Sequence, residues 1–153
     1  MESPIGILKL ISDERALQAV LFDTVKLNDS AKLPPILHLA QKQLEEYFLG
    51  YRQQFDFTID PEGTNFQHLV WEKVLTVNFG STKSYFDIAR AVGSENSSRA
   101  IGLANGRNPI PIIIPCHRII GKNGKMTGYA GGLERKKWLL LHEQKYSANG
   151  RLF

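Results

Sequence analysis

Cysteine is almost absent from this sequence: its 153 residues contain one, Cys116. A single thiol excludes an internal disulfide and a cysteine-rich zinc finger. It is also typical of a reducing compartment, so we expect a cytoplasmic protein. The sequence has no run of 18 apolar residues and no signal-peptide layout at its start, which argues against a membrane span or a leader. The four histidines are too scattered for a metal site, and we expect no metal and no cofactor.

Charge is unevenly distributed along the chain. Residues 1–63 contain 6 basic and 10 acidic residues, a net charge of −4, whereas residues 64–153 contain 13 and 5, a net charge of +8. The change of sign coincides with a polar, turn-rich stretch at residues 60–64. We therefore predict two domains, 1–63 and 64–153. The second has the charge expected of a protein that binds a polyanion, although a basic surface without a partner is the alternative.

The N-terminal part predicts a small sheet with one helix. Residues 5–11 alternate as a strand that is apolar on both faces, and residues 16–22 are β-rich, so the two runs predict a hairpin. The Pro-Pro pair at residues 34–35 opens a helix that stops at Gly50. Alternation over residues 55–59 predicts another strand. No site is recognisable in this part, and we expect it to be a scaffold.

The C-terminal part begins with three predicted helices, which cover residue 66 to near residues 78–80, residues 85–92 and residues 99–104. Ser84 caps the second helix, and Ser97 or Ser98 caps the third. The last two are short and are joined by a Gly-containing turn, which makes them a candidate helix-turn-helix. Small side chains on the third helix allow it to approach a nucleic-acid groove closely. Paired short helices that only pack together are the alternative.

Residues 109–120 combine three prolines with a very apolar run. The prolines exclude a helix and a central strand, so we expect an extended, buried segment that delivers Cys116 and His117 to one place. Residues 121–124 predict a hairpin-type turn, and residues 129–132 a flexible loop that allows close approach.

A last helix is predicted over residues 133–145. Its apolar pattern predicts that Leu133, Trp138, Leu141 and the aliphatic stem of Lys137 face the core.

Cys116 is the candidate nucleophile, because a thiol beside a base or a positive field is readily converted to the reactive thiolate. His117 and Arg118 follow it directly. A lone cysteine is otherwise an inert, buried hydrophobe. Glu143 is either a solvated partner of a neighbouring lysine or a carboxylate that orients a histidine, as in a catalytic triad.

Four sequence motifs form a specific set: NP at residues 108–109, PCHR at 115–118, GYAGGL at 128–133 and WLLLHE at 138–143. As a set they closely resemble the O6-alkylguanine-DNA alkyltransferases, also called methylated-DNA–protein-cysteine methyltransferases, in their stand-alone bacterial form. The resemblance is strongest over residues 66–143. It implies an α+β fold, with a ribonuclease H-like N-terminal domain followed by a winged helix-turn-helix-like DNA-binding domain that carries the active site.

The resemblance implies a direct-reversal DNA repair enzyme. An O6-alkylated guanine is flipped out of duplex DNA, and the sulfur of Cys116 takes the alkyl group irreversibly, so each molecule acts once. His117 is the base, acting through a water, and Glu143 completes the relay. The implied partner is double-stranded DNA containing O6-alkylguanine, with no membrane involved. We expect a monomer, and activity on O4-alkylthymine stays open.

The resemblance also implies roles for surrounding residues. Arg99 enters the base stack in place of the flipped base, and Tyr85 rotates the phosphate and donates a proton toward the leaving base. Asn108 is the hinge between the recognition helix and the active-site segment. The remaining expected DNA contacts are Ala100, Asn105 and Arg107, and the remaining pocket residues are Pro115, Ile119, Tyr129 and Ala130. At position 130 some family members carry a serine.

Other functions leave parts of the pattern unexplained. Non-catalytic alkyltransferase-like proteins bind the lesion but replace the acceptor cysteine, which is present here. A helix-turn-helix regulator gives no reason for PCHR, the glycine loop or Glu143, and a cysteine hydrolase gives none for the DNA-binding helix. Some family members bind a structural zinc near the N-terminus, but this chain has no cysteine there, and we predict no zinc.

Overall fold

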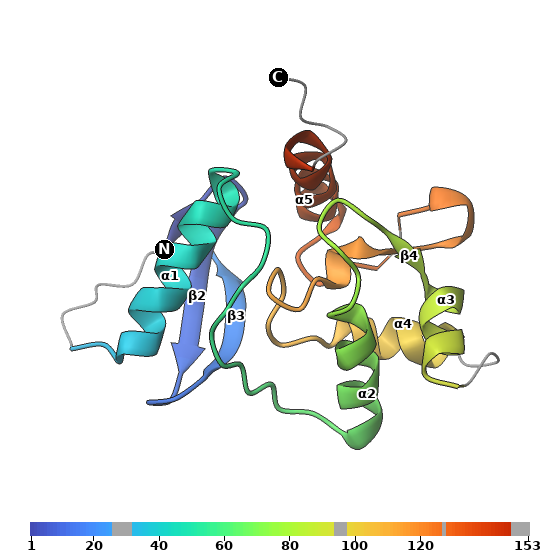
Figure 1. Cartoon of the computed structure of the whole chain (residues 1–153), viewed down its shortest axis with the longest axis horizontal. Helices are drawn as coiled ribbons and strands as arrows, with labels where there is room; N and C mark the ends of the chain where they lie inside the picture. Colours follow the sequence, from blue (N-terminus) through green and yellow to red (C-terminus); the bar gives the residue numbers. More distant parts are fainter. Residues whose placement is uncertain (26–31, 94–97, 127, 148–153) are drawn as a thin grey trace. The chain divides into compact units, whose positions relative to one another are not determined.

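The computed structural model describes residues 1–25, 32–93, 98–126 and 128–147. The chain forms two compact units (Figure 1). The first consists of Met1–Glu62 together with Pro109–Pro111, and the second of Gly63–Asn108 and the chain from Ile112 onward. Three residues between the helical region and Cys116 therefore belong to the first unit, which the charge pattern did not indicate.

The first unit contains a three-stranded antiparallel sheet in the order β1-β2-β3. Its elements are β1 (Glu2–Ser3), β2 (Gly6–Ser12), β3 (Leu17–Asp23) and the helix α1 (Pro35–Phe48). The predicted hairpin is confirmed, with Leu8 opposite Phe22 and Leu10 opposite Val20. Its turn is held by Asp13, whose Oδ1 accepts the backbone N–H groups of Arg15 and Ala16, each at 2.8 Å.

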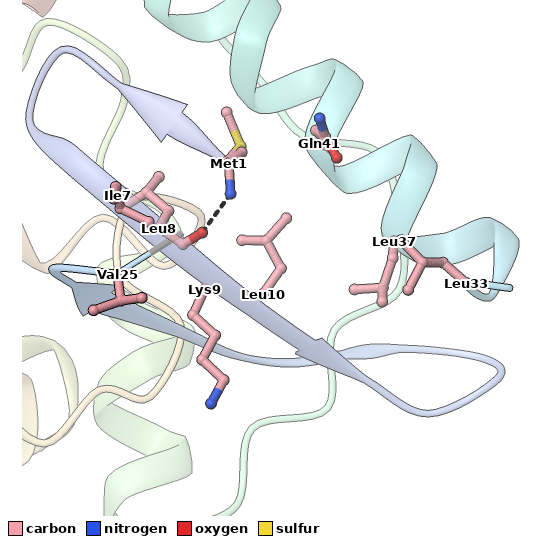
Figure 2. A pocket seen from close by; sticks show the side chains of 9 residues that line it. All are labelled: Met1, Ile7, Leu8, Lys9, Leu10, Val25, Leu33, Leu37 and Gln41. Atoms are coloured by element: carbon pink, nitrogen blue, oxygen red, sulfur yellow. Dashed lines mark hydrogen bonds between the residues drawn. The ribbon is translucent and has the colours of Figure 1, made fainter. Parts of the chain in front are cut away.

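The helix α1 packs against β2 and β3 (Figure 1). Pro34 precedes it, as predicted, because a proline at a helix start loses no intrahelical hydrogen bond. It ends just before Gly50, whose φ of +85° is the left-handed conformation that a glycine adopts without strain. A pocket of about 90 Å³ lies beside β2 and α1, where the amino group of Met1 donates to the carbonyl of Leu8 at 2.7 Å (Figure 2). The described residues that line it include no cysteine, histidine or carboxylate.

The strand predicted over residues 55–59 is wrong. Only Ile59 forms an isolated bridge, to Leu17. The alternating pattern has another cause, since Phe55 packs against Tyr47 and Phe57, with ring centroids 5.7 and 5.9 Å apart. Phe55 and Phe57 therefore belong to an aromatic cluster rather than to one face of a sheet.

The second unit is mainly helical. Its elements are α2 (Asn65–Val74), β4 (Lys83–Ser84), α3 (Tyr85–Ala91), α4 (Ser98–Gly106), the 3₁₀ turns η1 (Cys116–Arg118) and η2 (Lys122–Gly124), β5 (Ile119–Ile120) and α5 (Leu133–Tyr146). Capping boxes begin two helices: Thr64 with Gln67 at α2, and Ser84 with Asp87 at α3. The cap predicted at Ser84 is thus confirmed, whereas Ser97 lies outside the described residues.

The helices α2, α3 and α4 pack against one another (Figure 1). The indole N–H of Trp71 donates to the carbonyl of Ala104 at 2.9 Å, which ties α2 to α4. α2 ends at Val74, several residues before the predicted end. Leu69, whose helical spacing from Phe66 and Lys73 predicts a place on the core face, is half exposed, and Trp71 is buried instead.

The segment before Cys116 is not extended. The chain turns at Ile112, whose φ is +76°, and then enters the 3₁₀ turn η1. The prediction that the prolines exclude a helix is therefore wrong for residues 116–118. Pro115 is the cap residue of η1, and a proline disfavours helical structure in the residues before it rather than after it.

Residues 121–124 form the tight turn η2, in which Gly124 N–H donates to the Gly121 carbonyl at 3.2 Å and Gly121 N–H donates to the Lys125 carbonyl at 2.7 Å. The chain therefore reverses here as predicted, but no strand follows the turn within the described residues. β5 pairs instead with β4, in parallel.

α5 presents a different face to the core from the predicted one. Its buried residues are Lys136, Leu139, His142 and Glu143. Leu133 and Leu141 are 52% and 54% exposed, and Lys137 is exposed. Amphipathic reasoning failed because the buried face carries charged side chains, and these face the candidate site.

Candidate active site

The candidate site is built on η1, which carries Cys116, His117 and Arg118 in succession. Two buried asparagines hold this turn in position. Asn105 Nδ2 donates to the carbonyl of Cys116 at 3.1 Å, and Asn108 Nδ2 donates to that of Ile114 at 2.8 Å. Since both come from the end of α4 or just after it, the reactive turn is fixed to the second helix of the helix-turn-helix pair.

His117 pairs with Glu143 in the protein interior. Its Nε2 lies 2.7 Å from Glu143 Oε2, and the two side chains are 0% and 1% exposed. A carboxylate can only accept a hydrogen bond, so Nε2 carries the proton and Nδ1 carries the lone pair. Among the described residues Nδ1 has no hydrogen-bond partner. This nitrogen is therefore left as a proton acceptor.

Glu143 also accepts hydrogen bonds from three other donors. Arg118 Nε donates to Oε1 at 2.8 Å and Arg118 Nη2 to Oε2 at 3.0 Å, and the backbone N–H of Gly80 donates to Oε1 at 3.2 Å. Burial acts to raise the pKa of Glu143, but His117 and Arg118 outweigh it and lower the pKa well below its ordinary value. Glu143 is therefore an ionised carboxylate with both oxygens held in place.

The thiol and the imidazole are both kept neutral by burial. Burial raises the pKa of the Cys116 thiol to about 11, although the Asn108 side chain and the positive charge of Lys136 act in the opposite direction. Burial also lowers the pKa of His117, and with Arg118 and Lys136 acting in the same direction it outweighs the Glu143 carboxylate, which acts to raise that pKa. At neutral pH the site thus holds a thiol that needs a base, beside an imidazole that can act as one.

Two pocket residues predicted from the sequence lie with this group. Burial raises the pKa of Tyr129, and negative charge on the nearby Cys116 would act in the same direction. Ile119 is fully buried, and its carbonyl accepts a hydrogen bond from Lys136 Nζ at 2.6 Å. Pro115 is also buried, whereas Ala130 is exposed in its loop.

The residues expected to contact DNA divide into two groups. Arg99 and Arg107 are exposed, and Tyr85 and Ala100 are half-buried. The ring of Tyr85 lies against Gly102, which brings α3 and α4 close together. Asn105 needs a correction, because it is buried and bonded to Cys116 rather than exposed for DNA. The end of α4, which was predicted to contact DNA, thus turns the side-chain amide of Asn105 toward the protein interior.

Two residues of the site have no role in the sequence-based prediction. From the sequence, Arg118 is only a charge near the sulfur, and Lys136, like Lys137, is only a lysine that could pair with a solvated Glu143. Both are buried, with Lys136 fully so. Their spacing gives a partial signal, since Lys136 and Glu143 are seven residues apart and so share one face of a helix.

The described residues include no group of three or more His, Cys, Asp or Glu that could hold a metal ion. None of the described helices is long and apolar enough to cross a membrane.

Comparison with known proteins identifies the family. Two domain models of 6-O-methylguanine DNA methyltransferase match the chain, the ribonuclease-like domain over residues 1–61 and the DNA-binding domain over residues 65–145. The chain belongs to the 6-O-methylguanine DNA methyltransferase family. The resemblance predicted from the sequence motifs is confirmed, as are the α+β fold class and the assignment to an enzyme family.

Relatives of this family cover nearly the whole chain. The methylated-DNA–protein-cysteine methyltransferase of Methanosarcina acetivorans is 46% identical over 144 residues, which is 91% of this chain and 92% of the relative. The constitutive enzyme of Bacillus subtilis is 40% identical over 95% of this chain and 93% of its own length. The structure of Mycobacterium tuberculosis OGT in complex with DNA is 42% identical, with a TM-score of 0.87 over 95% of this chain and 91% of that one.

Proposed function

We propose that this protein repairs O6-alkylguanine in duplex DNA by transferring the alkyl group irreversibly to Cys116. The observation that carries the proposal is the buried His117–Glu143 pair, 2.7 Å apart, next to the only cysteine of the chain. Family membership supports the substrate class, since the relatives are named as methylated-DNA–protein-cysteine methyltransferases and one structural neighbour is a complex with DNA.

The reaction requires a proton to leave the thiol before or during attack. In the proposed mechanism His117 Nδ1 takes this proton, through a water, and Glu143 stabilises the imidazolium that forms. The sulfur then attacks the alkyl carbon, and the carbon–O6 bond breaks with its electron pair going to guanine. Guanine gains a proton, donated by Tyr85, and the tyrosine regains one from solvent as His117 releases the thiol proton to solvent, so the net change is exchange of the thiol proton for the alkyl group. The thioether is stable, and each molecule acts once.

Access to a buried thiol requires the base to leave the helix. Cys116 is only 5% exposed, so a guanine stacked in duplex DNA could not reach it without extrusion, which costs a few kcal/mol. In our proposal Arg99, at the exposed start of α4, fills the gap left by the base. Tyr85 rotates the phosphate and donates a proton toward the leaving base. Ala100 and Arg107 contact the DNA backbone, which carries no sequence code.

The proposed pocket for the flipped base is lined by the residues that surround η1. Pro115, Ile119 and Tyr129 form its walls, and Asn108 is its hinge. Ala130 offers only a backbone N–H to the O6 atom, where a serine would add a hydroxyl. We also infer a monomer, because transfer to one cysteine needs one chain, and a cytoplasmic location, because a single free thiol is typical of a reducing compartment. Activity on O4-alkylthymine is an additional outcome to measure.

Intact-mass measurement tests the proposal. The full chain is incubated with a duplex oligonucleotide containing one O6-methylguanine. We expect a gain of one methyl group, which peptide mapping locates on Cys116, and no gain with Cys116→Ala or with unmodified duplex. Binding of the lesion duplex without any mass gain would instead favour a non-catalytic lesion-binding protein.

A further inference from the structure

Arg118 is buried, although an arginine is rarely placed in a protein interior without a specific partner. All three guanidinium nitrogens are used. Nε and Nη2 bind the two oxygens of Glu143, at 2.8 and 3.0 Å, and Nη1 donates to the carbonyl of Val77 at 2.7 Å. The ring of Phe79 lies 5.8 Å from the guanidinium carbon. The arginine is thus held from two directions, by α5 and by the loop after α2.

This arrangement restricts what Glu143 can do. Its Oε2 is shared between His117 and Arg118, and its Oε1 between Arg118 and the backbone of Gly80. A planar, two-pronged ion pair of this kind fixes a carboxylate more firmly than a lysine could. Glu143 cannot rotate away from His117 without breaking bonds to Arg118, so the orientation of the imidazole depends on the arginine.

Arg118 also balances the charge of Glu143. Where a carboxylate is the only charged neighbour of a catalytic histidine, its negative charge favours the imidazolium form of that histidine. Here the negative charge already has a cationic partner, and Arg118 and Lys136 both act to lower the pKa of His117. The charged groups that act on His117 are Glu143 and Lys136 on α5 and Arg118 on η1. α2, which also packs against η1, adds none to this set.

We propose that Arg118 is a positioning residue for alkyl transfer. It holds both oxygens of Glu143 and neutralises their charge, so that Glu143 fixes the Nε2–H tautomer of His117 without turning His117 into an imidazolium. His117 then keeps a free lone pair on Nδ1 at neutral pH. The inference rests on the proposed alkyl transfer to Cys116 and deepens it, because it assigns the fourth residue of the PCHR motif to the proton-transfer step.

The first test uses single-turnover methyl transfer from the O6-methylguanine duplex between pH 5.5 and 9. Arg118→Met removes the charge and the hydrogen bonds, and we expect the acid limb of its rate profile to move to higher pH. For each pH unit by which the limb moves, the rate at a pH below the limb should fall about tenfold, because the fraction of His117 that is neutral falls by the same factor. Arg118→Lys keeps the charge, and we expect its limb near that of the wild type, with a slower plateau.

A matched control is Arg52→Met, which breaks an ion pair with Glu46 at 3.1 Å in the first unit. We expect its profile to equal that of the wild type. An acid limb in Arg118→Met at the wild-type pH would overturn the proposal. A wild-type protein that transfers no methyl group would instead overturn the proposed function itself.

A second measurement needs no variant and therefore does not depend on the variants folding. Nitrogen-15 NMR of the imidazole rings of the wild-type protein reports the protonation state and tautomer of His117, with His117→Gln used to assign the signal. We expect a neutral Nε2–H ring at pH 6.5. An imidazolium at that pH would show that Arg118 does not suppress its formation.

Discussion

Replacing Glu143 with glutamine should disable the proton relay while keeping the shape of the side chain. Four donors converge on the carboxylate: His117 Nε2, two nitrogens of Arg118 and the Gly80 N–H. The side-chain amide of a glutamine has only one oxygen. Its NH₂ group must therefore take the place of either Oε1 or Oε2 of Glu143, where it faces hydrogen-bond donors. At the Oε1 position both facing donors are fixed, whereas at the Oε2 position only Arg118 Nη2 is fixed and the histidine can change tautomer and accept. The NH₂ group should therefore face His117 and move the imidazole proton to Nδ1.

The expected magnitude follows from that change of tautomer. A histidine protonated on Nδ1 cannot take the thiol proton there, and the corresponding amide substitution in a serine-protease triad lowers the rate about 10⁴-fold. We expect a loss of the same order in single-turnover methyl transfer. Arg118 also loses its counter-charge, which should lower the free energy of unfolding by about 3–5 kcal/mol, as for other broken buried ion pairs.

Rate, stability and pH dependence are measured together. Glu45→Gln is the matched control, because Glu45 is exposed and bonds only weakly to Gln41 at 3.3 Å. The lowered pKa of Glu143 stabilises the fold fully above the ordinary glutamate pKa of about 4.5, and this contribution decreases as the pH falls further. The gap in Tm between wild type and Glu143→Gln should therefore narrow in acid. A folded Glu143→Gln protein with a rate within threefold of the wild type would refute the relay.

Three further predictions concern residues outside the relay. Arg99→Ala should slow repair of a duplex far more than reaction with free O6-methylguanine, and an equal loss on both substrates would contradict the role of Arg99 in the base stack. Asn108→Ala leaves the buried carbonyl of Ile114 without its donor, and urea denaturation should show a loss of about 1–3 kcal/mol; an unchanged midpoint would argue that the bond contributes nothing. Gly80→Ala should lower the Tm, because φ is +80° and an added Cβ would lie 2.6 Å from the Cβ of Ser147. A Tm equal to that of the wild type would show that this loop adapts.

The sequence predicted those elements that are fixed by interactions between residues close together in the chain. Ser84 begins α3 because its hydroxyl and the Asp87 carboxylate satisfy backbone N–H groups within one turn, and this pattern is visible in the sequence. The motif residues Cys116, His117 and Glu143 were identified through the family resemblance. Their meeting in space could not follow from spacing alone, since 26 residues separate the histidine from the glutamate.

Predictions failed where a long-range contact decides the outcome. The buried face of α5 carries Lys136 and Glu143, which apolar periodicity assigns to solvent. They are buried because the Ile119 carbonyl, His117 and Arg118 supply partners from another part of the chain. Phe55 and Phe57 alternate as in a strand, but no described strand pairs with them, and aromatic packing explains their partial burial. Neither the buried face of α5 nor this aromatic packing can be predicted from a short stretch of neighbouring residues.

Residues 109–111 determine when the first unit can finish folding during synthesis of the chain. They belong to the first unit, where Ile110 is fully buried and the Pro109 carbonyl accepts a hydrogen bond from Val20 at 2.9 Å. Domains of a nascent chain generally fold as units, N-terminal first. The first unit here cannot complete its core when its own 62 residues have emerged. It must wait until the helix-turn-helix has also left the ribosome, so the two units finish folding within the same short interval of translation.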